Sequence, residues 1–140
     1  MAAYFKYDQF VEDVHNGVHD LSTDVIKVAL TDRQPLVGDE VLVTASEIIY
    51  TNLPTSRVLT LVSSTQTGGT YTLTLTDPDP LTATGGPVAQ FQWIVIYNDT
   101  PAATPTDPLI AWYDYGSKVN LADTETFTID LPAGVLFTAT

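Results

Sequence analysis

Residues 91–97 read Phe-Gln-Trp-Ile-Val-Ile-Tyr, and every side chain in this run except Gln92 is apolar or aromatic. Successive side chains of a strand point to opposite faces, so both faces of this segment are apolar. A strand of this kind is typical of a position inside a sheet that is covered on both sides. The run therefore predicts a central strand.

Two later segments extend this pattern outward. Residues 109–115 repeat the two-sided apolar pattern more weakly. In residues 124–131 the side chains of one predicted face alternate with three threonines and an aspartate; these are Glu125, Phe127, Ile129 and Leu131. Clean alternation predicts a strand with one solvent-facing side. We therefore expect three strands of one sheet around residues 91–131.

A pair of glycines, Gly68 and Gly69, separates a polar segment from an alternating Thr-Tyr-Thr-Leu-Thr-Leu-Thr run at residues 70–76. Two glycines between alternating segments are typical of a tight hairpin turn, so we predict a hairpin here. Further strands are expected at residues 25–31, 57–63 and 134–139, with brief pairing at 81–84. Residues 41–43 form a short strand at most, and 45–50 fit either a helical turn or a strand. We expect tight turns at 116–117 and 122–123.

One segment has helical spacing. Apolar residues in 8–15 recur at i, i+1 and i+4, Asp8 is suited to an N-cap, and Asn16-Gly17 supplies a C-terminal stop. About eight strands with one short N-terminal helix predict an all-β fold, a β-sandwich with jelly-roll-like order. We expect a single domain over residues 8–140, preceded by an arm at 1–7. Its expected core comprises Leu73, Leu75, Trp93, Val95, Phe127 and Ile129.

Composition excludes several classes of protein. The chain has 140 residues, no cysteine and a net charge of −12 from 17 acidic and 5 basic residues. The missing cysteines remove disulfides and thiolate sites, and the acidic balance argues against direct nucleic-acid binding. No apolar run approaches the roughly 18 residues of a membrane span, and the start lacks secretory features. We expect synthesis in a cytoplasm and no membrane partner.

Two pairs of residues are candidate metal ligands. His15 and His19 have the i, i+4 spacing of a helical metal pair, but Gly17 lies between them and Asn16 replaces the glutamate of a zinc protease. Asp77 and Asp79 stand in a proline-rich turn that lacks the glycine and glutamate of a calcium loop. A helix terminus and a plain turn explain these residues better, and we expect no metal and no cofactor.

Catalytic motifs are also weak. The chain has no Gly-x-Ser-x-Gly, phosphate loop or dinucleotide motif, and no carboxylate pair stands out, although a small hydrolase remains open. Four aromatic residues could form a sugar-stacking platform, but their apolar context favours core or interface; these are Trp93, Trp112, Tyr113 and Tyr115. The sequence therefore predicts a protein that is not an enzyme.

Two exposed segments are candidate partner contacts. Tyr4 and Phe5 lie in the N-terminal arm, which has no sequence-local partner. The loop 100–108 is stiffened by Pro101, Pro105 and Pro108, which lowers the entropy lost on docking. These five residues are the candidate contact residues.

Several turn and strand strings together resemble small all-β virion proteins of tailed bacteriophages, close to capsid cement or decoration proteins. They lie at 13–19 (Asp-Val-His-Asn-Gly-Val-His), 64–71 (Ser-Thr-Gln-Thr-Gly-Gly-Thr-Tyr), 97–100 (Tyr-Asn-Asp-Thr) and 112–116 (Trp-Tyr-Asp-Tyr-Gly). The resemblance implies a homo-oligomer, a dimer or trimer, on the outer capsid surface of the virion. There it would bind the major capsid protein and stabilise the head without catalytic residues. The alternative is a tail or neck component with a structural or carbohydrate-binding adhesion role.

Overall fold

The computed structural model describes residues 3–130 and 135–139, whose strands form one antiparallel seven-stranded sheet and a separate two-stranded ladder. The sheet order is β1-β7-β6-β2-β3-β4-β9, and the ladder is β5-β8. The strands are β1 (Ala3–Lys6), β2 (Ile26–Thr31), β3 (Val58–Thr67), β4 (Thr70–Thr76), β5 (Leu81–Thr82), β6 (Phe91–Asn98), β7 (Leu109–Val119), β8 (Thr126–Phe127) and β9 (Val135–Ala139). The helices are α1 (Asp8–His15) and α2 (Leu42–Ala45). The prediction of an all-β fold is confirmed.

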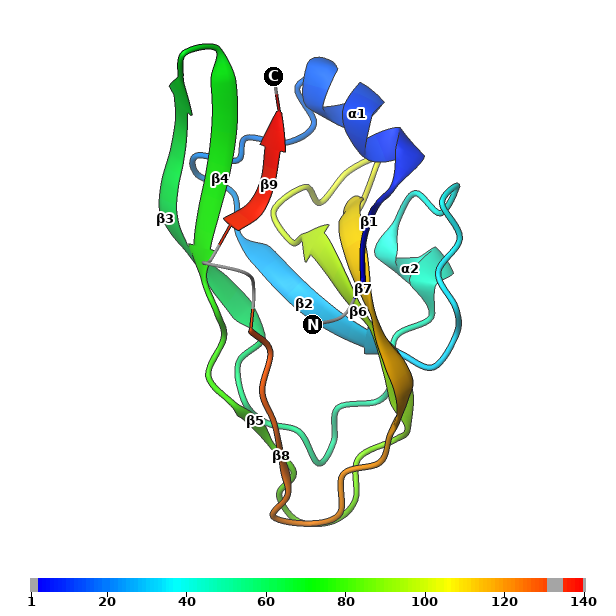
Figure 1. Cartoon of the computed structure of the whole chain (residues 1–140). Helices are drawn as coiled ribbons and strands as arrows, with labels where there is room; N and C mark the ends of the chain where they lie inside the picture. Colours follow the sequence, from blue (N-terminus) through cyan, green and yellow to red (C-terminus); the bar gives the residue numbers. More distant parts are fainter. Residues whose placement is uncertain (1–2, 131–134, 140) are drawn as a thin grey trace.

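The sheet curls instead of lying flat (Figure 1). β2 pairs with β3 through only two residues, Ile26 and Lys27, so the sheet can bend at this joint. β3, β4 and β9 form the part of the sheet beyond it, on the opposite side of Figure 1 from β1, β6 and β7. In the same view α1 crosses the upper end, and the β5–β8 ladder lies toward the lower end.

The predicted central strand is confirmed. β6 lies between β2 and β7, and residues 94–98 are all buried. The prediction that Trp93 belongs to the core is wrong, because its side chain is only partly buried and Lys118 Nζ lies 4.9 Å from its ring centroid. The other five predicted core residues are buried: Leu73 and Leu75 on β4, Val95 on β6, and Phe127 and Ile129. The side chains that fill the core completely include Tyr7, Ile26, Val28, Leu30, Leu73, Leu75, Leu81, Phe91, Ile96, Leu109 and Ile110.

The hairpin and the helix also form where the sequence predicts them. Thr67 pairs with Thr70 across the turn, and Gly68 and Gly69 have φ angles of 58° and 84°, which side chains rarely adopt. α1 ends at a C-cap on Asn16, followed by a left-handed Gly17. The N-cap is Tyr7, not Asp8, which lies in the first turn where a carboxylate complements the helix dipole.

Three local predictions are wrong. β7 continues through residues 116–117 to Val119, because Gly116, with a φ of 91°, lies where the β6–β7 register shifts, so the backbone bulges without turning back. Residues 42–45 form the short helix α2, and the expected strand at 41–43 is reduced to one bridge from Val41 to Pro108. Within residues 124–130 only Thr126–Phe127 pair as a strand, and Glu125 is exposed. The turn at 122–123 is present, since Glu125 N donates to Ala122 O.

The predicted separation of residues 1–7 as an arm does not hold for residues 3–7. β1 pairs with β7 in antiparallel register, matching Tyr4 with Tyr113 and Phe5 with Trp112, and Tyr7 is fully buried. The aromatic side chains that suggested a free arm instead find rings on a strand more than a hundred positions later. Residues 1–2 of the predicted arm, Leu131 of the predicted strand 124–131 and Gly134 of the predicted strand 134–139 lie outside the described residues. Neither helix in residues 3–130 and 135–139 has the length and apolar character needed to cross a bilayer.

Candidate interaction surface

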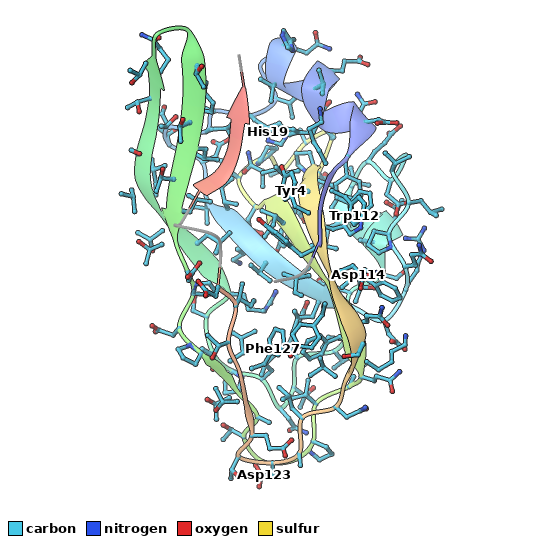
Figure 2. The ribbon with its side chains drawn as sticks, viewed as in Figure 1. Tyr4, His19, Trp112, Asp114, Asp123 and Phe127 are labelled. Atoms are coloured by element: carbon cyan, nitrogen blue, oxygen red, sulfur yellow. The ribbon has the colours of Figure 1, made fainter. Side chains whose placement is uncertain are left out.

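The predicted contacts on β1 stay partly exposed although they pack on their own domain. Tyr4 meets Tyr113 edge-on at 5.3 Å between ring centroids, while Phe5 stacks on Trp112 at 5.1 Å. Tyr4 is 38% exposed and Phe5 44% exposed, since β1 is an edge strand. Burial, with a smaller contribution from Tyr113, raises the pKa of Tyr4 to about 12, so its hydroxyl stays neutral. Figure 2 labels Tyr4 and Trp112 on either side of β1.

The proline loop between β6 and β7 is fixed at both ends. Asn98 N donates to Pro108 O at 3.0 Å, and Asp107 N donates to Pro101 O at 3.3 Å. Pro101 and Pro105 are half-buried, whereas Pro108 is buried at its bridge to Val41. Pro108 is therefore not a surface contact, contrary to the prediction.

The loop meets the α2 segment at the start of β7. Leu42 N donates to Asp107 O, and Leu109 N donates to Glu40 O, each at 3.0 Å. Next to these hydrogen bonds the protein surface has a pocket of about 380 Å³. Five residues line it and define what we call the α2 pocket: Leu42, Val43, Ser46, Glu47 and Asp107.

The α2 pocket combines apolar and acidic groups. Val43 is 83% exposed, and Asp107 is half-buried. Burial, followed by the nearby charges of Asp99 and Glu47, raises the pKa of Asp107 above its ordinary value, while Lys27 opposes the shift. In the part of the chain that the structure describes, the Asp107 carboxylate has no hydrogen bond or ion pair.

The two neighbouring acids already have cations. Lys27 Nζ lies 3.1 Å from Asp99 Oδ2, and Arg57 Nη1 lies 3.9 Å from Glu47 Oε2. Glu47 also accepts a hydrogen bond from the Tyr50 hydroxyl at 2.9 Å. Asp107 is thus the acid of this group whose charge is least compensated.

Exposed aliphatic side chains gather in the segment that contains α2. Leu36 is 58% exposed, Val37 50% and Ile49 76%, in addition to Val43. Scattered exposed apolar residues are normal, but four large ones within residues 36–49 of one connecting segment are consistent with a contact surface.

A second group of polar residues is buried where the end of β6 meets the turn after α1. Asn98 is fully buried; its Nδ2 donates to Asp24 Oδ2 at 2.6 Å and lies 3.1 Å from His19 Nδ1. Because Asn98 supplies the donor, the neutral His19 ring carries its proton on Nε2. Asp13 Oδ2 and His19 Nε2 are buried without a hydrogen-bond partner among the described residues. Figure 2 shows His19 beneath α1, away from the lower end that holds Phe127 and Asp123.

Burial lowers the pKa of His19, and the nearby Asp13 and Asp24 carboxylates offset this only in part. The ring also packs edge-on against Phe10 at 5.0 Å. His19 is 8% exposed, so a substrate could not reach it without local opening. His19 contacts Phe10 on α1 and Asn98 on β6, and this geometry fits a structural contact between the two elements better than general acid–base catalysis.

The candidate metal residues do not come together. α1 ends at His15, which is exposed, so His15 and His19 do not share a helical face. Asp79 is exposed in the turn after β4, beside a buried Pro78. Within residues 3–130 and 135–139 no group of three acidic or histidine side chains has a metal-binding arrangement.

The sugar-stacking alternative is contradicted by burial. Trp112 and Tyr113 are 7% and 5% exposed, and Lys118 lies over Trp93. Tyr115 alone of the four is exposed, at 49%, and its ring meets Phe127 edge-on. These four residues therefore do not present a row of open rings.

Sequence reasoning missed both the α2 pocket and the buried polar group. Three adjacent apolar side chains at residues 41–43 predict a short strand, and this pattern gives no indication that Val43 is exposed. The sequence does contain a signal for the buried position of Asn98, because it follows directly after the two-sided apolar run 91–97 and so stays in the same buried layer. The chain matches no protein-family model, and no curated protein or solved structure matches it.

Proposed function

We propose that the protein is a structural component of a tailed-phage virion, a cement protein that binds the outer surface of the major capsid lattice and stabilises the head. The observation that carries the proposal is the set of four exposed aliphatic side chains within residues 36–49 on a strongly acidic β domain. Such a surface supports a binding role, and the resemblance to phage decoration proteins supplies the partner. The jelly-roll-like sandwich and the dimer or trimer remain parts of this proposal.

Charge sets a condition on how such copies bind. Each copy carries a net charge of −12, so neighbouring copies on a lattice repel one another. Apolar contact and basic spots on the shell must together exceed that repulsion. Exposed charges interact over about 8 Å at physiological ionic strength, so added salt weakens the repulsion between copies as well as their attraction to the shell.

Electron cryo-microscopy of phage heads mixed with the purified protein tests the proposal. We expect repeated density on the outer face of the capsid lattice, at many equivalent positions. Density confined to the tail or neck would replace the proposal with the adhesion alternative. Heads that remain bare at saturating protein would exclude attachment to the capsid.

A further inference from the structure

We propose that the α2 pocket binds a segment of a partner protein in which a lysine or arginine stands beside an aliphatic side chain. The inference deepens the proposed function and rests on it, because the partner is taken to be a subunit of the capsid lattice. It adds the surface used and the chemistry that this surface recognises.

The apolar half of the recognition comes from α2. Leu42 is buried and forms part of the pocket, while Val43 projects outward with 83% of its surface exposed. An aliphatic side chain seated here would remove Val43 from water and contact Leu42. This half of the pocket provides affinity for any apolar group but little specificity.

The acidic half provides the specificity. Lys27 and Arg57 are engaged with Asp99 and Glu47, so among the described residues no cation lies within ion-pair distance of the Asp107 carboxylate, and Lys27 acts on it only at longer range. It is half-buried and lies in the same pocket as Val43. A partner ammonium or guanidinium group would supply the missing charge, and a charge-assisted hydrogen bond in this partly desolvated position is stronger than one in open water.

The backbone holds these groups ready. Ser46 and Asp107 both line the pocket, and both are non-glycine residues with left-handed φ angles, 57° and 48°. Residues in this region cost free energy and collect at ligand-binding sites. The hydrogen bond from Leu42 N to Asp107 O and the bridge from Val41 to Pro108 fix the two sides of the pocket to each other.

The volume and the charge of the α2 pocket limit which ligands can bind in it. A volume of about 380 Å³ accommodates a few side chains of an extended segment, not a folded domain. A second copy of this chain is a poor occupant of the pocket, because four of its five basic side chains already pair with its own carboxylates. A basic, aliphatic segment of a different protein complements the pocket in both respects.

Nuclear magnetic resonance titration of the whole protein tests the pocket directly. The probe is the blocked pentapeptide Gly-Leu-Lys-Leu-Gly, and the control peptide carries glutamate in place of lysine. We expect shifts confined to residues 41–47 and 99–108, with a dissociation constant of about 1 mM for the lysine peptide. Equal binding of both peptides, or shifts centred elsewhere, would overturn the proposal. Concentration-dependent shifts of the same residues without peptide would overturn it too, by assigning the pocket to a second copy.

Two substitutions separate the apolar and acidic halves. Asp107→Asn keeps a side chain that tolerates the left-handed backbone and should weaken the lysine peptide about tenfold. Val43→Ser should weaken it about fivefold. Matched controls are Asp79→Asn in an exposed turn and Val62→Ser on β3, where Val62 is 61% exposed; each should stay within about twofold of the unaltered protein. Equal losses in the controls would show that net charge or general apolarity, and not the pocket, drives binding.

Co-sedimentation with phage heads distinguishes this inference from the proposed function. If the unaltered protein fails to sediment with heads while the peptide still binds, the capsid role is wrong and the pocket remains. If the protein sediments and Asp107→Asn and Val43→Ser sediment equally well, the capsid role remains and this surface is not the one used. Loss of sedimentation in these two variants alone supports both.

Discussion

The ring of Phe5 stacks on that of Trp112 with centroids 5.1 Å apart and planes inclined by 18°. Tyr7 covers the same indole at 4.6 Å, so β1 and the residue after it cap an aromatic group on β7. The N-terminal strand therefore completes the sheet on this side, and its removal would open both the β7 edge and Trp112 to water.

Replacing Phe5 with Ala should lower the free energy of unfolding by about 1–2 kcal/mol, because a partly exposed ring and its stack on Trp112 are lost. Urea denaturation followed by tryptophan fluorescence measures the change. Val62→Ala, at an exposed position on β3, is the control and should cost less than about 0.5 kcal/mol. Equal costs for the two substitutions would mean that the stack does not stabilise the fold.

The two tryptophans should differ in their contribution to stability. Trp112→Ala should cost about 3–5 kcal/mol, since Trp112 is 7% exposed and packs against the rings of Phe5 and Tyr7. Trp93→Ala should cost about 1–2 kcal/mol, because the partly buried ring loses some apolar contact and a cation–π contact with Lys118. A Trp93 variant less stable than the Trp112 variant would contradict the observed burial.

Asp39 should stabilise the segment before α2. Its two oxygens accept hydrogen bonds from Arg33 at 2.8 and 3.1 Å, and one also accepts from Leu36 N at 2.9 Å. Asp39→Asn should cost about 2 kcal/mol, because a nearly buried carboxylate loses its charge-assisted hydrogen bonds from the partly exposed Arg33. The more exposed Lys118–Asp32 pair supplies the control, and Asp32→Asn should shift the urea midpoint little.

Asp39 should also make the stability of the folded protein fall in acid. Burial alone would raise the pKa of Asp39, but hydrogen bonds from Arg33 and Leu36 and the Arg33 charge hold it below its ordinary value of 3.8. A lowered carboxyl pKa stabilises the folded state above pH 3.8, and this contribution is lost as pH falls through the folded value. The Asp39→Asn variant should therefore show a smaller loss of stability between pH 5 and pH 3 than the unaltered protein, measured by urea titration.

His19 should make stability depend on pH in a higher window. Its pKa is lowered below 6.5 by burial, so the unfolded chain binds a proton before the folded one, and stability falls as pH drops below 6.5. The urea midpoint should be lower at pH 5.5 than at pH 7.5. His19→Gln should flatten this difference, and His15→Gln, at an exposed position, should keep it. An unchanged slope in the His19 variant would assign the effect to other groups.

The substitution Asp107→Asn should change stability and binding in opposite directions, because it should stabilise the free domain while it weakens binding of the lysine peptide. The pKa of Asp107 is raised by burial and then by Asp99 and Glu47, so at pH 7 the ionised carboxylate disfavours the folded state. Asp107→Asn should raise the stability of the free domain at pH 7 by about 0.5 kcal/mol or less, and the gain should vanish in acid as the native carboxyl protonates. Thermal denaturation at pH 7 and at pH 3, below the ordinary carboxyl pKa of 3.8, measures both. A destabilised variant at pH 7 would show that the carboxylate is satisfied in the fold.

Much of the fold follows from local patterns. The two-sided apolar run fixes β6 as a central strand, and the paired glycines fix the β3–β4 turn, because both signals are contained within a few adjacent residues. The position of β1 could not be predicted in this way, since Phe5 and Trp112 are brought together only by the folded sheet. The turn predicted at Gly116 is wrong for a related reason. A left-handed glycine can form either a bulge or a turn, and pairing across the sheet decides which of the two forms.

The candidate site was predicted only in part. The sequence predicts partner contacts in the proline loop because the loop has three prolines and no large apolar residue, and this stays a prediction; the structure shows that Asp107 of the loop lines the α2 pocket. The pocket itself depends on Leu42 meeting Asp107 across the fold, and on Lys27 and Arg57 pairing with other acids. These are long-range choices among several carboxylates, and spacing along the chain cannot rank them.

We propose that the protein stabilises an assembled phage shell by binding it. A ligand that binds only the assembled state raises that state's stability by mass action. The most direct measurement is the temperature at which heads release their DNA, recorded with a DNA-binding dye, for heads stripped of the protein and for the same heads saturated with it. The account predicts release at a higher temperature from the saturated heads. Identical release temperatures at saturation would contradict it.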